Sequence, residues 1–397
     1  MVGISSAPIR LVPKIIAVHL ACLILSGPFI PLTVKVFLYF SAIIYTLYVF
    51  YLVVTRRAGA AVPRSALVLP VAAFFLAVEA SVLVSTDFYQ SQKIFFSRYL
   101  GYFWAFFLGC VAAKDPKGKA VMIWALALNA LAISIGALWD HFQFSSLRLF
   151  TAFGRDVNLA TMLGLYIPFF FSLALVAGPK KVRYLCWVLL IPLNLSLLWH
   201  ASRAAWVGIG VALFFIALMT QRKIIPWLIA ILCLVYLASP LHLRYRMHRI
   251  FDAGTKVAMS RTAFEIFEDF PVTGGGLATF ENLRDIYDPH ARTDYLHTDN
   301  VYTELMAETG LMGLMTFIWI FYAFFADRLR LILQQLARRR LDPLVLGLSA
   351  AVAAVLIISL GTNTMTVGFQ NAVIFWILLG FAAGIEPAPS EGPVGEA

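Results

Sequence analysis

The stretch DYLHTDNVYTELMAETG, residues 294–310, gathers side chains that could do acid–base chemistry, although 61% of the chain is hydrophobic. It holds one histidine, His297, together with four carboxylates and several hydroxyls. Histidine is the side chain that changes charge near neutral pH, which suits a general base that takes a proton from a hydroxyl group. His297 is therefore the first candidate for a catalytic residue.

Two short polar segments carry arginines that could bind an anion. Arg203 and His200 lie in LWHASRAAWVG, at the junction of two apolar runs with almost no loop between them. RLFTAFGRDVNLA brings Arg155 and Asn158 to the same predicted face. A guanidinium offers a planar fork of donors that matches phosphate oxygens. Arg203 could instead extend along apolar surface to reach the membrane–water interface.

The segment SRTAFEIFEDFP, residues 260–271, places Phe264, Phe267 and Phe270 three residues apart. This spacing predicts an amphipathic helix that could lie on the membrane surface. The PVTGGG that follows should end the helix, because glycines allow a tight turn. Arg261 would then stand at the start of the helix, where a cation opposes the helix dipole, so we expect it to have an anionic partner elsewhere.

A run of His and Asp side chains within residues 285–299 suggests a metal site as an alternative. The spacings match no compact zinc signature such as HExxH, in which two ligands share one helix face. We therefore expect no metal at this segment. The residues of the run are Asp285, Asp288, His290, Asp294, His297 and Asp299.

The elements that must position these residues are membrane helices. Charged residues make up 13% of the 397 residues and the mean hydropathy is +0.84, whereas soluble domains are roughly a quarter charged. Apolar runs near twenty residues long predict an all-α polytopic membrane protein with about 12 transmembrane helices rather than a barrel. The predicted spans are residues 12–30, 32–54, 66–85, 94–113, 120–139, 158–177, 184–201, 204–220, 224–239, 311–326, 343–361 and 370–386.

The positions of the lysines and arginines predict the orientation of these spans. Most of them fall in short segments on one side, which the positive-inside rule makes cytoplasmic, together with both termini. The net charge of +10 does not indicate a nucleic-acid partner, because the basic loops are short and carry no nucleic-acid motif. The predicted divisions are transmembrane helices over 1–239, one long outward segment over 240–310, further spans over 311–386 and a cytoplasmic tail over 387–397.

Four segments within about residues 150–325 together resemble the O-antigen ligase and polymerase superfamily. SRAAWVG is similar to its SRxxW signature, and FGRDVNLA to its Asn-Leu-Ala element. SRTAFEIFEDFPVTGGGLATF resembles its arginine-led helix with a following proline and glycine-rich turn, although Phe264 stands near where the family often has tryptophan. HTDNVYTELMAETGLMGLMTF resembles its His-x-x-Asn-x-Tyr and Glu-x-Gly-x-x-Gly pattern.

The resemblance implies a multi-pass protein of the bacterial inner membrane with a GT-C-like fold and a periplasmic active site. Such a protein takes a glycan from undecaprenyl pyrophosphate, and the ligases attach it to a sugar of lipid A-core, without a cofactor. On this reading the partners are that donor, that acceptor and the membrane lipids.

The resemblance also implies roles for individual residues. Arg203 and Arg261 would clamp the pyrophosphate, and His297 would take the proton of the acceptor hydroxyl, with inversion at the anomeric carbon. The remaining residues of the predicted site would bind or orient the substrates. They are Arg155, Asn158, His200, Asn300, Tyr302 and Glu304.

Three alternatives stay open. An O-antigen polymerase or a protein O-oligosaccharyltransferase of the same superfamily would differ in the acceptor. The single long outward segment favours the ligase over the polymerase. A lipid or solute transporter is a different class, and it predicts pseudo-symmetric halves with broken helices and ionisable groups along a path. Glu79 is the carboxylate that falls inside a long apolar run, and the ionisable groups otherwise collect at one face.

Overall fold

The computed structural model describes residues 7–26, 31–55, 65–144, 156–200, 202–230, 254–288, 297–363, 365 and 368–385. Within these ranges every regular element is helical, which confirms the all-α prediction. The elements that build the bundle are α1 (Ala7–Ser26), α2 (Pro31–Val54), α3 (Val68–Leu83), α4 (Phe88–Ile94), the π-helix η2 (Phe95–Tyr99), α5 (Leu100–Ala112), α6 (Pro116–Phe144), α7 (Asp156–Val176), α8 (Lys180–His200), α9 (Arg203–Thr220), the 3₁₀ turn η3 (Arg222–Ile224), α14 (Val301–Ala337), α15 (Pro343–Ile358) and α16 (Phe369–Ala383). Two further helices, α12 (Gly254–Asp269) and α13 (Phe280–Tyr287), lie between η3 and α14 in the sequence.

Length and composition support a polytopic membrane protein. Seven helical segments of the described chain are long and apolar enough to cross a membrane, and four shorter helices are also apolar. The predicted total of about 12 spans stays a prediction, because the segment 224–239 lies largely outside the described residues. The seven are Leu32–Val54, Phe88–Ala112, Pro116–Phe142, Leu159–Val176, Lys180–Trp199, Arg203–Thr220 and Val301–Ala337.

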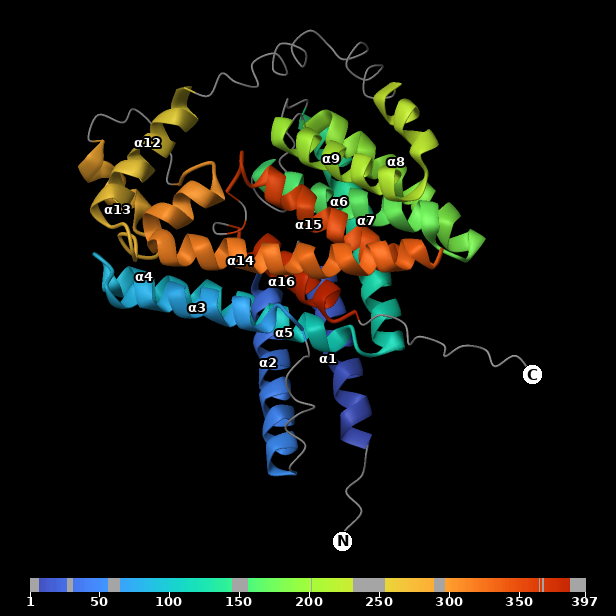
Figure 1. Cartoon of the computed structure of the whole chain (residues 1–397), viewed down its shortest axis with the longest axis horizontal. Helices are drawn as coiled ribbons and strands as arrows, with labels where there is room; N and C mark the ends of the chain where they lie inside the picture. Colours follow the sequence, from blue (N-terminus) through green and yellow to red (C-terminus); the bar gives the residue numbers. More distant parts are fainter. Residues whose placement is uncertain are drawn as a thin grey trace.

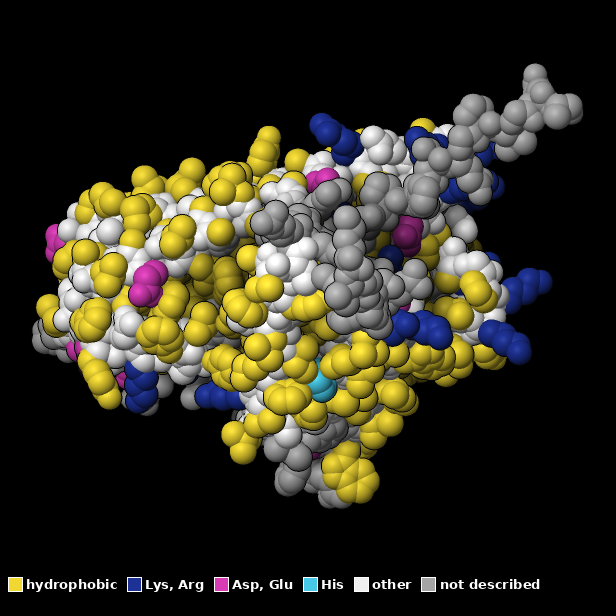
Figure 2. Space-filling view, turned by 90° about the horizontal axis from the view of Figure 1, so that it is seen from below, with side chains coloured by type: hydrophobic (Ala, Val, Ile, Leu, Met, Phe, Trp, Pro, Cys, Tyr) yellow, Lys and Arg dark blue, Asp and Glu magenta, His cyan; other side chains and the backbone are white. Residues whose placement is uncertain are grey.

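α7 forms the centre of the bundle. Of its candidate span, 89% is buried, whereas the span in α8 is 22% buried. α15 and α8 pack along α7, and α16 packs along α5, which accounts for the continuous apolar core. The apolar side chains that α8 leaves exposed are those expected of a helix that faces lipid. Figure 2 shows hydrophobic side chains over much of one face of the molecule.

The helices α12 and α13 and the start of α14 lie at one end of the long axis (Figure 1). α12, α13, α4 and the first turns of α14 occupy the left of that view, and α14 then runs to the right beside α3. α14 is interrupted at Gly310, whose backbone angles of φ 60 and ψ −161 are not helical. The helix beyond Gly310 is therefore joined to a shorter outer piece, Val301–Thr309, that carries the polar side chains.

The structure corrects the prediction for α12. The helix begins at Gly254 rather than near Ser260, so Arg261 lies two turns inside it and does not face the helix dipole at the terminus. The buried face carries Met259, Ala263 and Ile266, which pack with α13 and α14. Phe264, predicted to lead the apolar stripe, is 50% exposed.

Candidate functional site

The glycine-rich turn after α12, residues 271–276, is inserted into the break in α14. The first two amides after Gly310 donate to carbonyls at the start of the turn, at 2.9 and 3.1 Å. In return the amides of Gly275 and Gly276 donate to the carbonyls of Ala307 and Glu308, at 2.9 and 3.0 Å. The turn thus supplies the hydrogen bonds that the helix loses at its kink, which fixes the outer piece of α14 relative to α12.

Two positions in this junction require glycine. Gly310 and Gly274 both have positive φ angles, of 60° and 69°. A Cβ at Gly310 would lie 2.4 Å from the carbonyl carbon of Val272, and a Cβ at Gly274 would lie 2.3 Å from that of Glu308. Backbone cannot retreat as a flexible side chain can, so the two segments approach this closely only with glycine on both sides.

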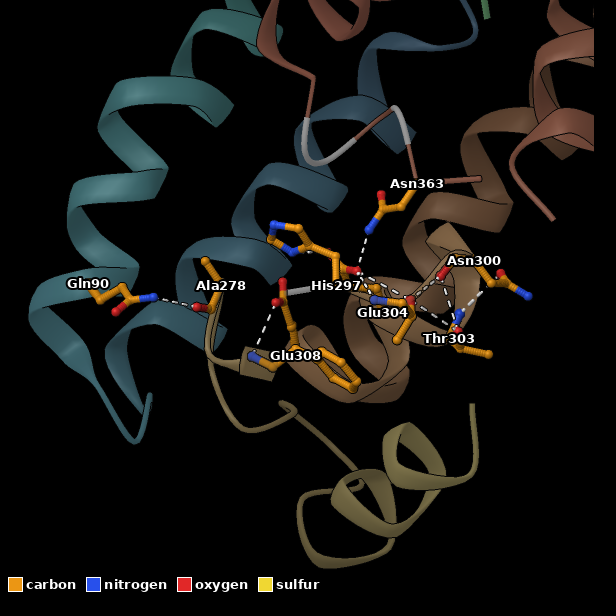
Figure 3. Close-up of polar contacts among 10 residues, drawn as sticks. Gln90, Ala278, His297, Asn300, Thr303, Glu304, Glu308 and Asn363 are labelled. Carbon is orange, nitrogen blue, oxygen red and sulfur yellow. Dashed lines mark hydrogen bonds and ion pairs between the residues drawn. The ribbon is translucent and has the colours of Figure 1, made fainter. Parts of the chain in front are cut away.

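The junction is also held from the α3–α4 side. Thr86 donates to the carbonyl of Gly275 through its amide at 3.0 Å and its hydroxyl at 2.9 Å. The Gln90 amide group donates to Ala278 at 2.7 Å, as Figure 3 shows, and the Ser91 hydroxyl donates to Leu277 at 2.6 Å. Sequence reasoning missed these residues, because more than 180 positions separate them from the turn that they hold.

α12 and α13 are joined by a further contact, from the Tyr287 hydroxyl to the carboxylate of Asp269. This hydrogen bond, with a smaller contribution from burial, raises the pKa of Tyr287 to about 12. The phenol therefore stays protonated, and remains a donor, throughout the physiological pH range.

His297 faces a buried carboxylate on the outer piece of α14. Its Nδ1 lies 3.6 Å from Oε1 of Glu304, and the two side chains are 32% and 2% exposed (Figure 3). Oε2 of Glu304 accepts from the Thr298 amide at 3.0 Å, lies 3.2 Å from the Thr298 hydroxyl and accepts from Asn363. Glu304 is therefore fixed in place, and it can orient an imidazole whose other nitrogen is left to act on a substrate.

Asn300 is the N-cap of α14. Its side-chain oxygen accepts from the amides of Tyr302 at 2.9 Å and Thr303 at 3.4 Å. The cap satisfies two of the amides that a helix leaves unpaired at its start. The amide nitrogen of Asn300 is then the side-chain atom able to contact a substrate.

Tyr302 turns toward the bundle. Its hydroxyl donates to the carbonyl of Leu356 in α15 at 3.1 Å, and its ring meets Phe317 edge to face. These packing contacts account for a tyrosine at this position. Its predicted role in substrate binding stays a prediction.

Glu308 lies one turn after Glu304 and is also buried, with 3% of its surface exposed. Its carboxylate accepts from the amide of Phe280, the first residue of α13, at 3.4 Å. Arg98 of η2 acts on it electrostatically as a neighbouring cation. The Glu-x-Gly spacing before the kink marks Glu308 in the sequence, but it does not indicate what the residue does.

The two cations of α12 have different partners. Arg261 is 81% exposed and pairs with Glu265 one turn later, at 3.1 Å. Lys256 reaches the His297 segment, where its Nζ lies 3.1 Å from Oδ2 of Asp299. The sequence does not indicate this contact, because it joins two segments that lie far apart along the chain.

The comparison with known protein families gives a match over the part of the chain that contains most of these residues. Residues 185–318 match the family model described as O-antigen ligase. This segment is similar to the O-antigen ligase family. It covers about a third of the chain and contains Arg203, Arg261 and His297. The curated proteins include no match to this sequence.

Within the O-antigen ligase segment, the predicted anion-binding residue Arg203 lies at the start of a helix. Arg203 is the first residue of α9, and Ser202 caps that helix by accepting from the Ala205 amide at 3.4 Å. Arg155 lies outside the described residues, as do the side chains of Asn158 and His200. The convergence of Arg203 and Arg261 on one anion therefore stays a prediction.

Residues outside the O-antigen ligase segment complete the site. Asn363 comes from the connection after α15, and Thr86, Gln90 and Ser91 come from α4 and the residues just before it. Of the predicted run of His and Asp residues, His290 and Asp294 lie outside the described residues. Among the residues that the structure describes, no three or more His, Cys, Asp or Glu side chains are grouped as metal ligands would be.

Proposed function

We propose that this protein transfers O-antigen polysaccharide from undecaprenyl pyrophosphate to a sugar hydroxyl of lipid A-core at the periplasmic face of the inner membrane. The observation that carries the proposal is the pairing of His297 with the buried Glu304 inside a segment of the O-antigen ligase family. A general base held at the polar end of a membrane helix suits a reaction between two amphipathic substrates.

The proposed step forms one bond and breaks another. Nε2 of His297 takes the proton of the acceptor hydroxyl, and the oxygen attacks the anomeric carbon of the donor glycan. The bond from that carbon to the pyrophosphate breaks, and the lipid pyrophosphate leaves with the electron pair, so the configuration inverts. Arg203 and Arg261 neutralise the charge that develops on the leaving group. The step uses neither a metal nor a nucleotide.

Glu304 has a defined part in this proposal. The carboxylate lies on the Nδ1 side of the ring, which leaves Nε2 as the nitrogen that acts as the base in the proposed step. The carboxylate also stabilises the imidazolium that forms when the proton arrives.

The test is a transfer assay with purified protein, polyprenyl-pyrophosphate glycan and lipid A-core, in the presence of a chelator. Glycan should appear on lipid A-core, and His297→Ala should lower the rate by about 10²–10⁴. His19→Ala is the matched control, because it removes a histidine of α1 and should leave the rate unchanged.

Other outcomes select the alternatives. Lengthening of the lipid-linked glycan beside unmodified lipid A-core indicates a polymerase, and glycan on an added protein acceptor indicates an oligosaccharyltransferase. Transfer to no acceptor, with movement of the glycan lipid across a vesicle membrane that depends on Glu79, indicates a transporter. One carboxylate oxygen of Glu79 is buried without a hydrogen-bond partner among the described residues, which is the observation that keeps this last arm in the test.

A further inference from the structure

Lys256 joins three parts of the chain that lie far apart in sequence. It lies in the first turn of α12, and its Nζ lies 3.1 Å from Oδ2 of Asp299, two residues after His297. The same nitrogen donates to the carbonyl of Gly361 at 2.7 Å. One ammonium group thus connects α12, the segment 297–300 and the connection after α15.

Lys256 and Arg261 point in different directions from α12. Five residues along a helix of 3.6 residues per turn place them about 140° apart around the axis. Arg261 is turned to solvent with Glu265, at 81% exposure, and Lys256 is turned to the His297 segment. Lys256 is therefore the cation by which the helix that carries Arg261 contacts the segment that carries His297.

Residues 359–363 are the common anchor of this arrangement. The carbonyl of Ser359 accepts from the amide of Val301 at 3.1 Å, and Asn363 donates to Glu304. Gly361 lies between them and accepts from Lys256. Two of the contacts hold the start of α14, and the third holds α12 against the same short stretch.

We propose that Lys256 is a positioning residue, which sets the place of His297 relative to α12 by holding Asp299 and Gly361 together. The role rests on the proposed function, since it concerns the base of the transfer reaction. Segment 297–300 lies outside regular structure, so its position depends on such side-chain contacts. A displacement of a base by about 1 Å can lower a rate about a hundredfold.

Lys256 suits a test by substitution because its ion pair is half-exposed, at 41% for each side chain. Pairs of this kind contribute little to global stability, so variants at both positions should fold. Lys256→Met keeps the apolar stem and removes the charge, and Asp299→Asn removes the partner charge without changing the shape.

The transfer assay should then show three results. Lys256→Met and Asp299→Asn each lower kcat by about tenfold or more, while the donor KM stays near the wild-type value. The double variant is no slower than the slower single variant, because both changes break one contact. Exchanging the two charges, as Lys256→Asp with Asp299→Lys, recovers part of the lost rate. Lys181→Met, an exposed lysine of α8, is the control for loss of a surface charge.

A second measurement separates this proposal from the proposed function. Amide hydrogen exchange at Thr298 and Val301 should be faster in Lys256→Met than in the wild type, whether or not the protein transfers glycan. Unchanged exchange would overturn the positioning role. Additive effects of the two single changes would also overturn it. So would a Lys256→Met variant with a raised donor KM and an unchanged kcat beside a fully active Asp299→Asn variant, because Lys256 would then bind the donor phosphate itself. Faster exchange in a protein that transfers nothing would leave the positioning role standing and remove the proposed function.

Discussion

At the scale of residues, one buried carboxylate connects most of the site. Glu304 accepts from Thr298 on the segment before α14 and from Asn363 after α15, and it faces His297. The sequence indicates His297 by its residue type, and Glu304 through the resemblance to the O-antigen ligase and polymerase superfamily. Asn363 could not be foreseen, because it is 59 residues from Glu304.

Two substitutions at Glu304 should have separable effects. Glu304→Ala removes the carboxylate that accepts from the Thr298 amide and the Asn363 side chain, and should cost about 1–3 kcal/mol of unfolding free energy as well as activity. Glu304→Gln keeps an acceptor oxygen and removes the charge, so it should lower transfer with a much smaller loss of stability. Thermal unfolding in detergent and the transfer assay measure the two effects. An equal loss of stability in both variants would show that the charge, and not the hydrogen bonds, holds the segment.

At the scale of elements, the insertion of the turn 271–276 into the break of α14 decides the geometry. Gly310→Ala would place a Cβ 2.4 Å from backbone in a region of φ and ψ that only glycine adopts readily. The strain alone costs on the order of 1–3 kcal/mol, and the clash adds to it. We expect a lower unfolding temperature and loss of transfer.

Gly210→Ala is the matched control for this prediction. Gly210 lies in α9, and a Cβ there meets nothing within 4 Å. Because alanine favours a helix over glycine, the control should be neutral or slightly stabilising. If Gly310→Ala unfolded at the same temperature as the control, the kink would not be the rigid junction described above.

The helices themselves were largely predictable, and the errors have physical causes. Long apolar runs identify the membrane helices, since each must satisfy its own backbone hydrogen bonds in lipid. The sequence predicts the start of α12 too late, because Phe264, Phe267 and Phe270 recur every three residues and mark only the second half of the helix. The buried residues Met259, Ala263 and Ile266 follow the helical spacing of four and three, which is the better guide. How the turn enters α14 depends on backbone contacts between distant segments, which residue types do not reveal.

At the scale of the whole molecule, the predicted orientation can be tested directly. α12 and α13 lie at one end and the last turn of α14 at the other (Figure 1), and many of the visible lysines and arginines gather toward one end (Figure 2). Asp288→Cys should react with a membrane-impermeant maleimide in intact inner-membrane vesicles of native orientation, and Arg339→Cys should react only after lysis. The native chain, whose described cysteines are partly or fully buried, controls for background labelling. The opposite pattern would invert the topology and place the His297 segment in the cytoplasm.

The site is divided among three stretches of the chain, of which the O-antigen ligase segment, residues 185–318, is one. A hybrid that received only this segment from a relative would gain a histidine and a glutamate but would keep the recipient's residues 85–91 and 359–363. Its turn 271–276 would then contact the recipient's side chains in place of Thr86 and Ser91, and its Glu304 would contact the recipient's residue in place of Asn363. A functional hybrid therefore requires all three stretches to be transferred together. Compensating substitutions are expected between positions that lie far apart in the sequence.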